Sequence, residues 1–388
     1  MFFIKNKLFL FLLLIFQVFL IYSFSIKSLT EILSEALDIK YEKVLDTYKF
    51  NYYPFFNENH KRSGIFDECF ILHINQGIVQ GSKGLVFLND TLIKEMIWAK
   101  RIDFLDQPQN IDNSKFILGS VAVIAQFAGD SYCHFMHEAL GRLALLEMQN
   151  IKYDHVYVSY LKPFVYEMLL LWGVDFDKII IANQENSIIK ADTLILPSLV
   201  INNDENFKGA GFHPHPVTSS YVRDKLLNSV LKLDIDTSKF SKKVFISRKD
   251  APLRKIINED EVFELFKPYG FVRYELSSLT VSEQIMLMHN ADMVVGEHGA
   301  GLTNILFCKP ATLVVELFQE LIDSSNWWIA NIAQLKYFPI NTLNQDDSWA
   351  ADWKNNIQKM NNAWSCSMII PLDQIVKMID SLKTELYL

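Results

Sequence analysis

The sequence predicts an α/β protein with two open, Rossmann-like parallel sheets and a transmembrane helix at its N-terminus. Short apolar runs alternate with helix-length segments from residue 116 onward, a pattern typical of parallel strands covered by helices. A polar stretch at residues 234–242 divides this alternation into two halves. The 388 residues, half of them hydrophobic, are enough for two hydrophobic cores.

The first half begins with a strand rich in valine and isoleucine. We expect a strand, helix, strand and helix, then two short strands, a loop and a long helix. In that order the predicted segments are residues 116–127, 134–149, 155–159, 164–172, 178–182, 193–196, 209–216 and 219–233.

The second half repeats the alternation and contains a glycine-rich turn. Its predicted segments are strand 243–247, helix 259–267, strand 271–275, helix 281–289, strand 292–295, turn 296–301 and strand 313–317. Ligands of open parallel sheets bind beyond the carboxyl ends of the strands, so functional residues are expected at that edge.

These patterns divide the chain into four parts. We assign residues 1–27 to a cytoplasmic tail and membrane anchor and residues 28–235 to an N-terminal Rossmann-like domain. Residues 240–365 form a C-terminal Rossmann-like domain, and residues 366–388 form a C-terminal helix.

An uncharged apolar run starts at Leu8 and ends at Ile26. As a helix it would span roughly 28 Å, about one hydrocarbon core. Lys5 and Lys7 precede it, so the charge bias places the N-terminus in the cytoplasm and the body across the membrane. This predicts a single-pass type II protein facing the lumen of the endoplasmic reticulum or Golgi. The alternative is a cleaved signal peptide, because residues 23–25 offer small side chains at a suitable spacing.

The redox state of the four cysteines depends on that location. They are Cys69, Cys133, Cys308 and Cys366. In an oxidising lumen they could form two disulfides in any of three pairings, whereas in the cytosol they would stay reduced. Their spacing matches no zinc finger. The sequon at Asn89 would be glycosylated only in the lumen.

The charge balance argues against nucleic acid as a partner. The chain carries 37 basic and 45 acidic residues, a net charge of −8. A nucleic-acid-binding protein is expected to have an excess of basic residues instead.

The glycine-rich turn predicts an anion site. Gly296, Gly299 and Gly301 remove side chains from the turn between an apolar strand and a helical segment. The backbone N–H groups of Gly299, Ala300 and Gly301 would then lie at a helix N-terminus, where unpaired donors and the helix dipole favour an anion. The glycine spacing is neither the dinucleotide fingerprint nor the phosphate loop of ATPases, so NAD and ATP are disfavoured. The alternative is a tight turn whose glycines only permit close packing.

His298 favours the anion site over simple packing. An imidazole between small residues has little to pack on, but it can bind a phosphate or a sugar hydroxyl.

Arginines supply positive charge at the same edge. Arg248 directly follows strand 243–247, and Arg254 lies in the loop before the next helix. A guanidinium can hold phosphate oxygens through two parallel hydrogen bonds. Asn258 and Glu259 can cap that helix, contact the ligand, or do both.

The helix predicted from His134 carries the candidate catalytic groups. His134 and Glu138 lie four residues apart and so share a face, with His137 beside them. Facing a cleft, Glu138 or His134 would take a proton from an acceptor hydroxyl. The alternatives are histidines that pack or cap, and a zinc site. Metal is not predicted, because the order is neither His-Glu-x-x-His nor His-x-x-Glu-His.

Three segments in the same order together match one family. They are Tyr132-Cys133-His134-Phe135-Met136-His137-Glu138, residues 244–248 with 254–261, and His298-Gly299-Ala300-Gly301-Leu302-Thr303-Asn304. These segments resemble the signature of glycosyltransferase family 61. Members of that family often carry Asp at the position of Glu138.

The resemblance implies a two-lobed GT-B fold and an inverting transferase. It would move a sugar of the GlcNAc, xylose or arabinose class from a UDP-sugar to a hydroxyl of a glycan or glycoprotein. Residues 28–235 would serve the acceptor and residues 240–365 the nucleotide sugar. The donor-binding residues would be Arg248, Arg254, Asn258, Glu259, His298, Gly299, Ala300, Gly301 and Leu302. Fixed protein donors would replace a divalent metal, so no cofactor is expected.

Two other functions stay open. A membrane-anchored module that binds a nucleotide or glycan without turnover would keep the glycine turn. A hydrolase would have to use residues 134–138, because the chain has no Gly-x-Ser-x-Gly motif.

Overall fold

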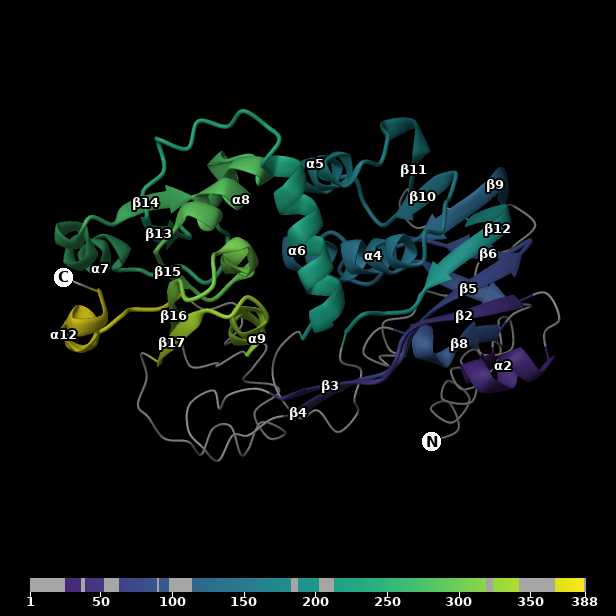
Figure 1. Cartoon of the computed structure of the whole chain (residues 1–388), viewed down its shortest axis with the longest axis horizontal. Coiled ribbons are helices and arrows are strands. Elements are labelled where there is room, and N and C mark those ends of the chain that lie inside the picture. The colour runs from purple at the N-terminus through teal and green to yellow at the C-terminus, as the bar shows by residue number, and fades with distance from the viewer. Residues whose placement is uncertain are drawn as a thin grey trace, which may run out of the picture.

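The computed structural model describes residues 25–35, 39–51, 63–88, 91–97, 114–182, 188–201, 213–318, 324–341 and 367–386. Two main sheets lie on either side of helix α6 (Pro216–Val230), as Figure 1 shows. Both contain parallel strands and are packed against helices, which confirms the predicted α/β class. The sequon at Asn89, Cys366 and most of the predicted membrane span lie outside the described residues.

The second sheet has five strands, all parallel, in the order β14-β13-β15-β16-β17. The strands are β13 (Lys243–Ser247), β14 (Val272–Glu275), β15 (Met293–Glu297), β16 (Leu313–Phe318) and β17 (Lys336–Asn341). Counted along the chain, this is the doubly wound order 2-1-3-4-5, in which the connections change direction between β13 and β15. A ligand is therefore expected beyond the carboxyl ends of these two strands.

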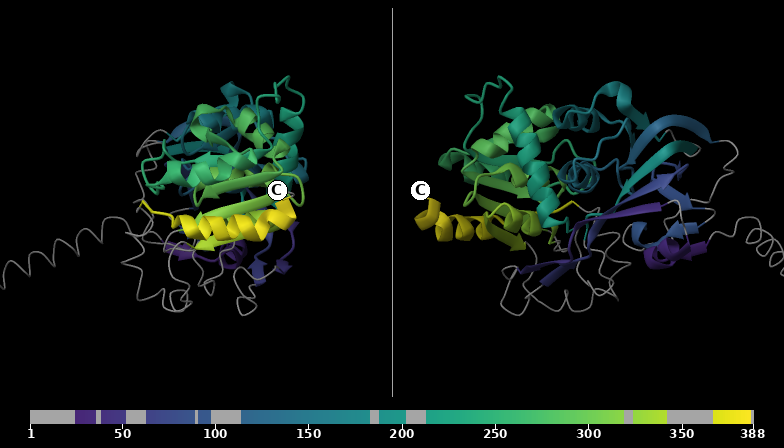
Figure 2. Two further views of the ribbon diagram at one scale, coloured as in Figure 1. Left: turned by 90° about the vertical axis from the view of Figure 1, so that its left-hand side faces the viewer. Right: turned by 45° about the vertical axis from the view of Figure 1, so that its right-hand side comes forward.

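Helices follow each strand of this sheet, and the boundaries predicted between residues 243 and 317 agree to within two residues. Strand β17 lies beyond that predicted alternation. The helices are α7 (Glu259–Phe266), η8 (Lys267–Tyr269), η9 (Leu276–Ser278), α8 (Val281–Asn290), η10 (Ala300–Phe307), α9 (Ser325–Ile332) and α12 (Leu372–Leu386). Helix α12 packs beside α7 (Figure 1) and is the yellow helix next to the marked C-terminus in Figure 2. The C-terminal helix expected within residues 366–388 is thus present.

The first sheet is mixed, so the fully parallel sheet predicted for residues 28–235 is wrong. The strands of the predicted alternation are parallel to one another and are β12 (Ile188–Pro197), β9 (Lys115–Val123), β10 (His155–Val158) and β11 (Ile179–Ile181). Strands β5 and β6 pair with β12 in antiparallel fashion. They belong to a group before residue 114 that alternation did not predict: β1 (Ser25–Lys27), β2 (Ile39–Leu45), β5 (Cys69–Asn75), β6 (Ile78–Gln80), β7 (Leu85–Leu88) and β8 (Thr91–Ile93).

The same N-terminal part contains β3 (Tyr48–Asn51) and β4 (Ser63–Phe66), which form a separate two-stranded sheet, and helices α2 (Leu29–Glu35) and η2 (Lys94–Met96). Ile26, the last residue of the predicted membrane span, belongs to β1, which pairs with β8. Over the ranges that the structure describes, no helix combines the length and apolar character needed to cross a bilayer.

The helices of the first half differ from prediction mainly at their starts. They are α3 (Tyr132–His134), the π-helical turn η6 (Phe135–Ala139), α4 (Leu140–Met148), α5 (Pro163–Trp172), η7 (Phe176–Lys178) and α6. The helix expected at residues 134–149 therefore begins at Tyr132 and contains a π turn. Helix α6 begins at Pro216 because the fixed φ of proline suits a first turn, and His215 accepts the N–H of Val217.

One hydrophobic core crosses the boundary predicted at residues 234–242. Its buried members include Leu143 of α4, Val222 of α6, Ile285 of α8 and Leu306 of η10. Helix α6 contacts α4 on one side and α8 and η10 on the other, so it joins the two halves.

Cys69 and Cys308 are buried free thiols, so the four cysteines do not form two disulfides. Burial raises the pKa of each of these thiols to about 12. Both are therefore protonated and unreactive at neutral pH.

Candidate functional site

A pocket of about 600 Å³ lies at the carboxyl ends of β13 and β15. Both halves of the chain contribute to its wall, which includes Tyr132, Phe164, Glu167, Ser247, Arg248, Glu297, Gly301 and Leu302. The volume is that of a typical small-molecule site. Of the predicted donor residues, Arg248, Gly301 and Leu302 line this wall, and neither predicted catalytic residue does.

Arg248 is fixed against the glycine turn. Its Nε donates to the carbonyl oxygen of Arg254 and its Nη2 to that of Leu253, both at 3.2 Å. Its Nη1 lies so close to Gly299 that a Cβ there would be 2.1 Å away. The backbone of Gly299 is extended and open to any residue, so this close approach is the reason for glycine.

The surroundings of Arg248 favour an anion. Burial lowers the pKa of Arg248, and the charge of Arg254 lowers it further. Arg254 has a left-handed backbone with φ 57°, which is strained for a residue with a side chain. Its buried Nε has no hydrogen-bond partner among the residues described. Two guanidinium groups that repel each other gain from a bound anion between or beside them.

Helix η10 begins directly after Gly299, as predicted, but it is a 3₁₀ helix rather than an α-helix. Its first hydrogen bond runs from the N–H of Leu302 to the carbonyl of Gly299 at 3.0 Å. The N–H groups of Ala300 and Gly301 therefore precede the helical ladder and are available in principle to an anion.

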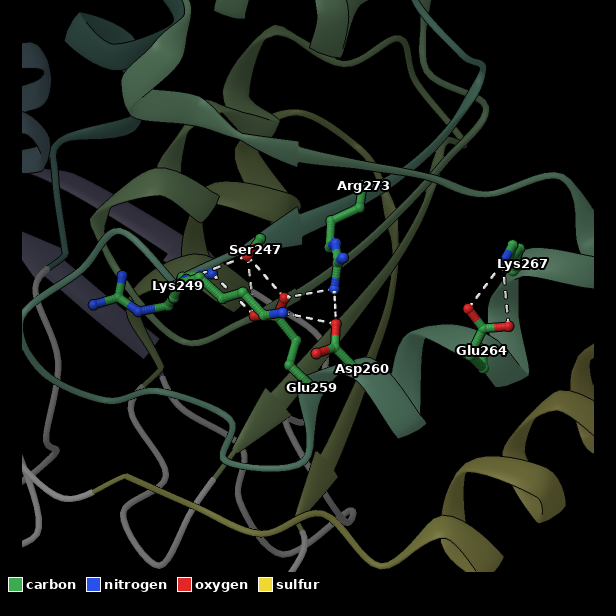
Figure 3. A network of polar contacts seen from close by, with 8 residues as sticks. Ser247, Lys249, Glu259, Asp260, Glu264, Lys267 and Arg273 are labelled. Atoms are coloured by element: carbon green, nitrogen blue, oxygen red, sulfur yellow. Dashed lines mark hydrogen bonds and ion pairs between the residues drawn. The ribbon is translucent and has the colours of Figure 1, made fainter.

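Glu259 is a buried carboxylate that binds the loop containing Arg248. It is 1% exposed, and it accepts hydrogen bonds from the Ser247 hydroxyl at 2.8 Å and from Arg273 at 3.3 Å. Arg273 also binds Asp260, which Lys249 contacts at 2.7 Å (Figure 3). The carboxylate predicted to contact the donor is thus already bound by protein groups.

Asn258 does not cap α7 with its side chain, contrary to one expectation. Its amide donates to the carbonyl of Ile370 at 2.8 Å and accepts the N–H of Ile370 at 2.9 Å. Asn258 therefore fixes the segment before α12, away from the pocket wall.

His298 is held by a buried carboxylate. Its Nδ1 lies 2.7 Å from Oε1 of Glu316, and its ring stacks on Phe318. Glu316 is fully buried and also accepts hydrogen bonds from Asn326 and Tyr337. This network fixes the orientation of the imidazole beside the glycine turn.

The two predicted catalytic residues form a dyad. His134 Nδ1 lies 2.5 Å from Oε1 of Glu138, and Gln126 Nε2 donates to the other carboxylate oxygen at 2.7 Å. Glu138 is 1% exposed, whereas the His134 side chain is 22% exposed. Glu138 is therefore placed to orient the imidazole, and His134 is the better placed of the two to meet an acceptor. Glu138 lies in the π turn and His134 directly precedes it. Such turns are frequent at functional sites.

Side-chain contacts fix the helical segment of α3 and η6 to η10, the helix that follows the glycine turn. The Tyr132 hydroxyl donates to Asn304 at 2.8 Å. His137 lies 3.1 Å from the Thr303 hydroxyl and 3.1 Å from that of Ser219. Burial lowers the pKa of His137 to about 3, so it is neutral and bridges η10 and α6.

The comparisons with known proteins concern this same region. Residues 132–315 match the model of a family described as Glycosyltransferase 61. Residues 132–315 are therefore similar to glycosyltransferase family 61, and we call them the family 61 region. It contains every candidate site residue named above, from His134 to Leu302.

Curated relatives match a shorter part of the chain. A stretch of 81 residues is 36% identical to the EGF domain-specific O-linked N-acetylglucosamine transferase of Gallus gallus and 35% identical to that of Mus musculus. The protein of the same name from Drosophila melanogaster is 32% identical over 77 residues. These matches cover 19–20% of this chain and 15% of each relative, so the chain spans only a small part of their length.

Two glutamates of the family 61 region were missed at the level of sequence. Glu297 ends β15 and is 2% exposed in the pocket wall. Glu167 of α5 accepts hydrogen bonds from the backbone N–H groups of Val281 and Ser282 at 2.9 and 2.8 Å, and so caps α8. Glu297 could have been found from the sequence, because it is an acidic residue between Gly296 and His298 in the glycine-rich turn. Nothing in the sequence relates residue 167 to residue 281.

Metal ligands do not gather in the described part of this family 61 region. No group of three His, Cys, Asp or Glu side chains is arranged to hold a metal ion in the residues that the structure covers.

Proposed function

We propose that the chain is an inverting glycosyltransferase that moves a sugar from a UDP-sugar to a hydroxyl group of a glycan or glycoprotein. The observation that carries the proposal is Arg248, held by two backbone carbonyls against Gly299 at the switch point of the second sheet. Its guanidinium and the first N–H groups of η10 provide fixed positive charge for a diphosphate leaving group.

In the proposed reaction, the acceptor oxygen attacks the anomeric carbon as the bond from that carbon to the diphosphate breaks. The proton of the acceptor hydroxyl passes to His134, which Glu138 orients through the bond at 2.5 Å. Negative charge that builds on the departing diphosphate is stabilised by Arg248, with Arg254 nearby. We propose that these fixed groups suffice without a divalent metal.

The choice of sugar follows the relatives. They are named N-acetylglucosamine transferases, so GlcNAc is the first donor sugar to test, followed by xylose and arabinose. We also propose a GT-B organisation, with the acceptor on the side of residues 28–235 and the donor on the side of residues 240–365. The parallel 2-1-3-4-5 sheet supports the donor side of this assignment.

A luminal location is likewise a proposal, resting on the apolar run that ends at Ile26. Protease protection of the full chain in sealed microsomes tests it. Digestion of the body without detergent would contradict the type II orientation.

Binding is tested by titrating the purified protein with UDP, GDP and CMP, comparing wild type with Arg248→Ala and Arg248→Lys. We expect UDP to bind preferentially and Arg248→Ala to weaken it by about tenfold or more. Arg248→Lys should recover part of the loss, because it restores charge without the planar fork. Lys267→Ala is the control, since this lysine is exposed and, among the residues that the structure describes, forms its ion pair with Glu264 (Figure 3).

Turnover separates the alternatives. An inverting transferase gives a product whose formation depends on the acceptor and whose anomeric configuration is inverted. We expect product formation to continue in the presence of a chelator. Release of free sugar that does not depend on an acceptor would instead indicate hydrolysis. Tight nucleotide binding with no product for any donor would favour the binding module.

A further inference from the structure

Four glutamates are buried among the described residues, and three of them are satisfied. Glu138 is bound by His134 and Gln126, Glu259 by Ser247 and Arg273, and Glu316 by His298, Asn326 and Tyr337. Glu297 is the exception. It is 2% exposed, and neither of its carboxylate oxygens has a hydrogen-bond partner in the described part of the chain.

The neighbouring arginines do not satisfy Glu297. Their charges act on it, but Arg248 directs its hydrogen bonds to the carbonyls of Leu253 and Arg254 instead. Burial raises the pKa of Glu297 to about 8, and the nearby Glu259 also raises it, although both arginines oppose this. The carboxyl group is therefore held in the pocket wall without a protein donor.

A buried polar group without a partner is unfavourable, and such groups in folded proteins usually have a reason. The raised pKa keeps Glu297 largely protonated at neutral pH in the free protein, so a ligand that converts it to the carboxylate must supply hydrogen-bond donors. A diphosphate has none to offer, because its oxygens only accept. The diphosphate should therefore meet the arginines and the N–H groups of η10, while a donor-rich part of the same ligand meets Glu297. Adjacent hydroxyl groups of a sugar match the two oxygens of a carboxylate.

We propose that Glu297 is a specificity-determining residue, whose carboxylate accepts hydrogen bonds from two adjacent hydroxyl groups of the nucleotide sugar. The proposal rests on the proposed function of the pocket as a donor site. The hydroxyl pair belongs either to the ribose or to the transferred sugar, and the two sources differ in which ligand reveals them.

The test is calorimetric titration of the full chain with inorganic pyrophosphate, UDP, 2′-deoxy-UDP and UDP-GlcNAc. We expect Glu297→Gln to lower the affinity for the ligand that carries the hydroxyl pair by about tenfold or more. The affinity for pyrophosphate should stay unchanged. If the ribose is the source, 2′-deoxy-UDP binds wild type about as weakly as UDP binds the variant. If the transferred sugar is the source, UDP binds wild type and Glu297→Gln with equal affinity. The variant then has a lower affinity for UDP-GlcNAc alone.

Two further variants keep the result interpretable. Glu264→Gln is the matched control, because Glu264 is exposed and its ion pair among the described residues is with Lys267. Glu297→Asp keeps the carboxylate with a shorter reach and should recover part of the affinity. Thermal melting of each variant reports on the fold.

Some outcomes overturn the proposal. Equal affinities of wild type and Glu297→Gln for every ligand would refute the role of Glu297 while leaving the donor site intact. An equal loss for pyrophosphate and UDP would show that Glu297 acts through the diphosphate instead. A folded wild type that binds none of the ligands would refute both the donor site and this inference.

Discussion

At the scale of the residue, the site is defined by how each polar side chain is held. Arg248 is fixed by two carbonyls, His134 by Glu138, and His298 by Glu316. Each functional group is thus oriented by a neighbour that does not line the pocket. Such support lets charged groups keep one geometry without reorganising when a substrate arrives.

Gly299 provides a test of this arrangement. In Gly299→Ala the new Cβ would lie 2.1 Å from Nη1 of Arg248, so the guanidinium must move away from the turn. We expect nucleotide affinity to fall by about tenfold, the loss expected for a displaced charge-assisted hydrogen bond. The melting temperature should change little, because the extended backbone accepts alanine.

Calorimetric titration with UDP measures this effect. Gly301→Ala is the comparison, since its Cβ would meet the end of the flexible Leu276 side chain at 3.2 Å and Ile246 at an ordinary contact distance of 3.9 Å. An unchanged affinity in Gly299→Ala would show that the position of Arg248 does not matter for the nucleotide.

At the scale of the element, the pocket depends on helix starts. Helix α8 has a capping box between Thr280 and Glu283, and Glu167 of α5 adds a second cap from the other half of the chain. A carboxylate at a helix N-terminus satisfies unpaired N–H groups and interacts favourably with the dipole. Glu167 therefore links α5 to α8 across the pocket.

Removal of this link should destabilise the protein. Glu167→Ala leaves the N–H groups of Val281 and Ser282 without their partner, and we expect a loss of about 1–2 kcal/mol in unfolding free energy. Urea unfolding measures it, with Glu264→Ala as an exposed control on α7. A loss no larger than that of the control would mean that Glu167 is not a structural link.

At the scale of the whole molecule, one core joins the two sheets through α6. His137 lies within this junction and contacts Ser219 of α6 and Thr303 of η10. The imidazole is fully buried, and its pKa of about 3 lies well below the ordinary value of 6.5. In the unfolded chain it would protonate near 6.5.

Stability should therefore fall in acid. Between pH 6.5 and 3 the unfolded state binds a proton at residue 137 that the folded state does not, so stability is lost as the pH falls through this window. Urea unfolding of wild type and His137→Gln at pH 7.5 and 4.5 measures the effect. We expect the advantage of wild type over the variant to shrink by about 1–3 kcal/mol at the lower pH. A constant difference would contradict a buried neutral His137.

Much of the local structure could be predicted from the sequence, because it depends on neighbouring residues. Alternation predicted the strands and helices between residues 243 and 317 to within two residues, and three glycines located the turn before η10. The four-residue spacing of His134 and Glu138 placed them on one face, where they form the predicted pair. These features follow from periodicity and from the backbone freedom of glycine.

Only the tertiary structure decided which of these residues meet the pocket. Asn258 and Glu259 bind protein groups instead of lining the wall, while Glu297 is buried in the wall with no hydrogen-bond partner among the described residues. The mixed first sheet likewise depends on pairings such as that of β5 with β12, over a hundred residues apart along the chain. Hydrogen-bond partners and burial depend on segments that are distant in sequence. A local sequence pattern therefore does not predict which buried side chain is hydrogen-bonded.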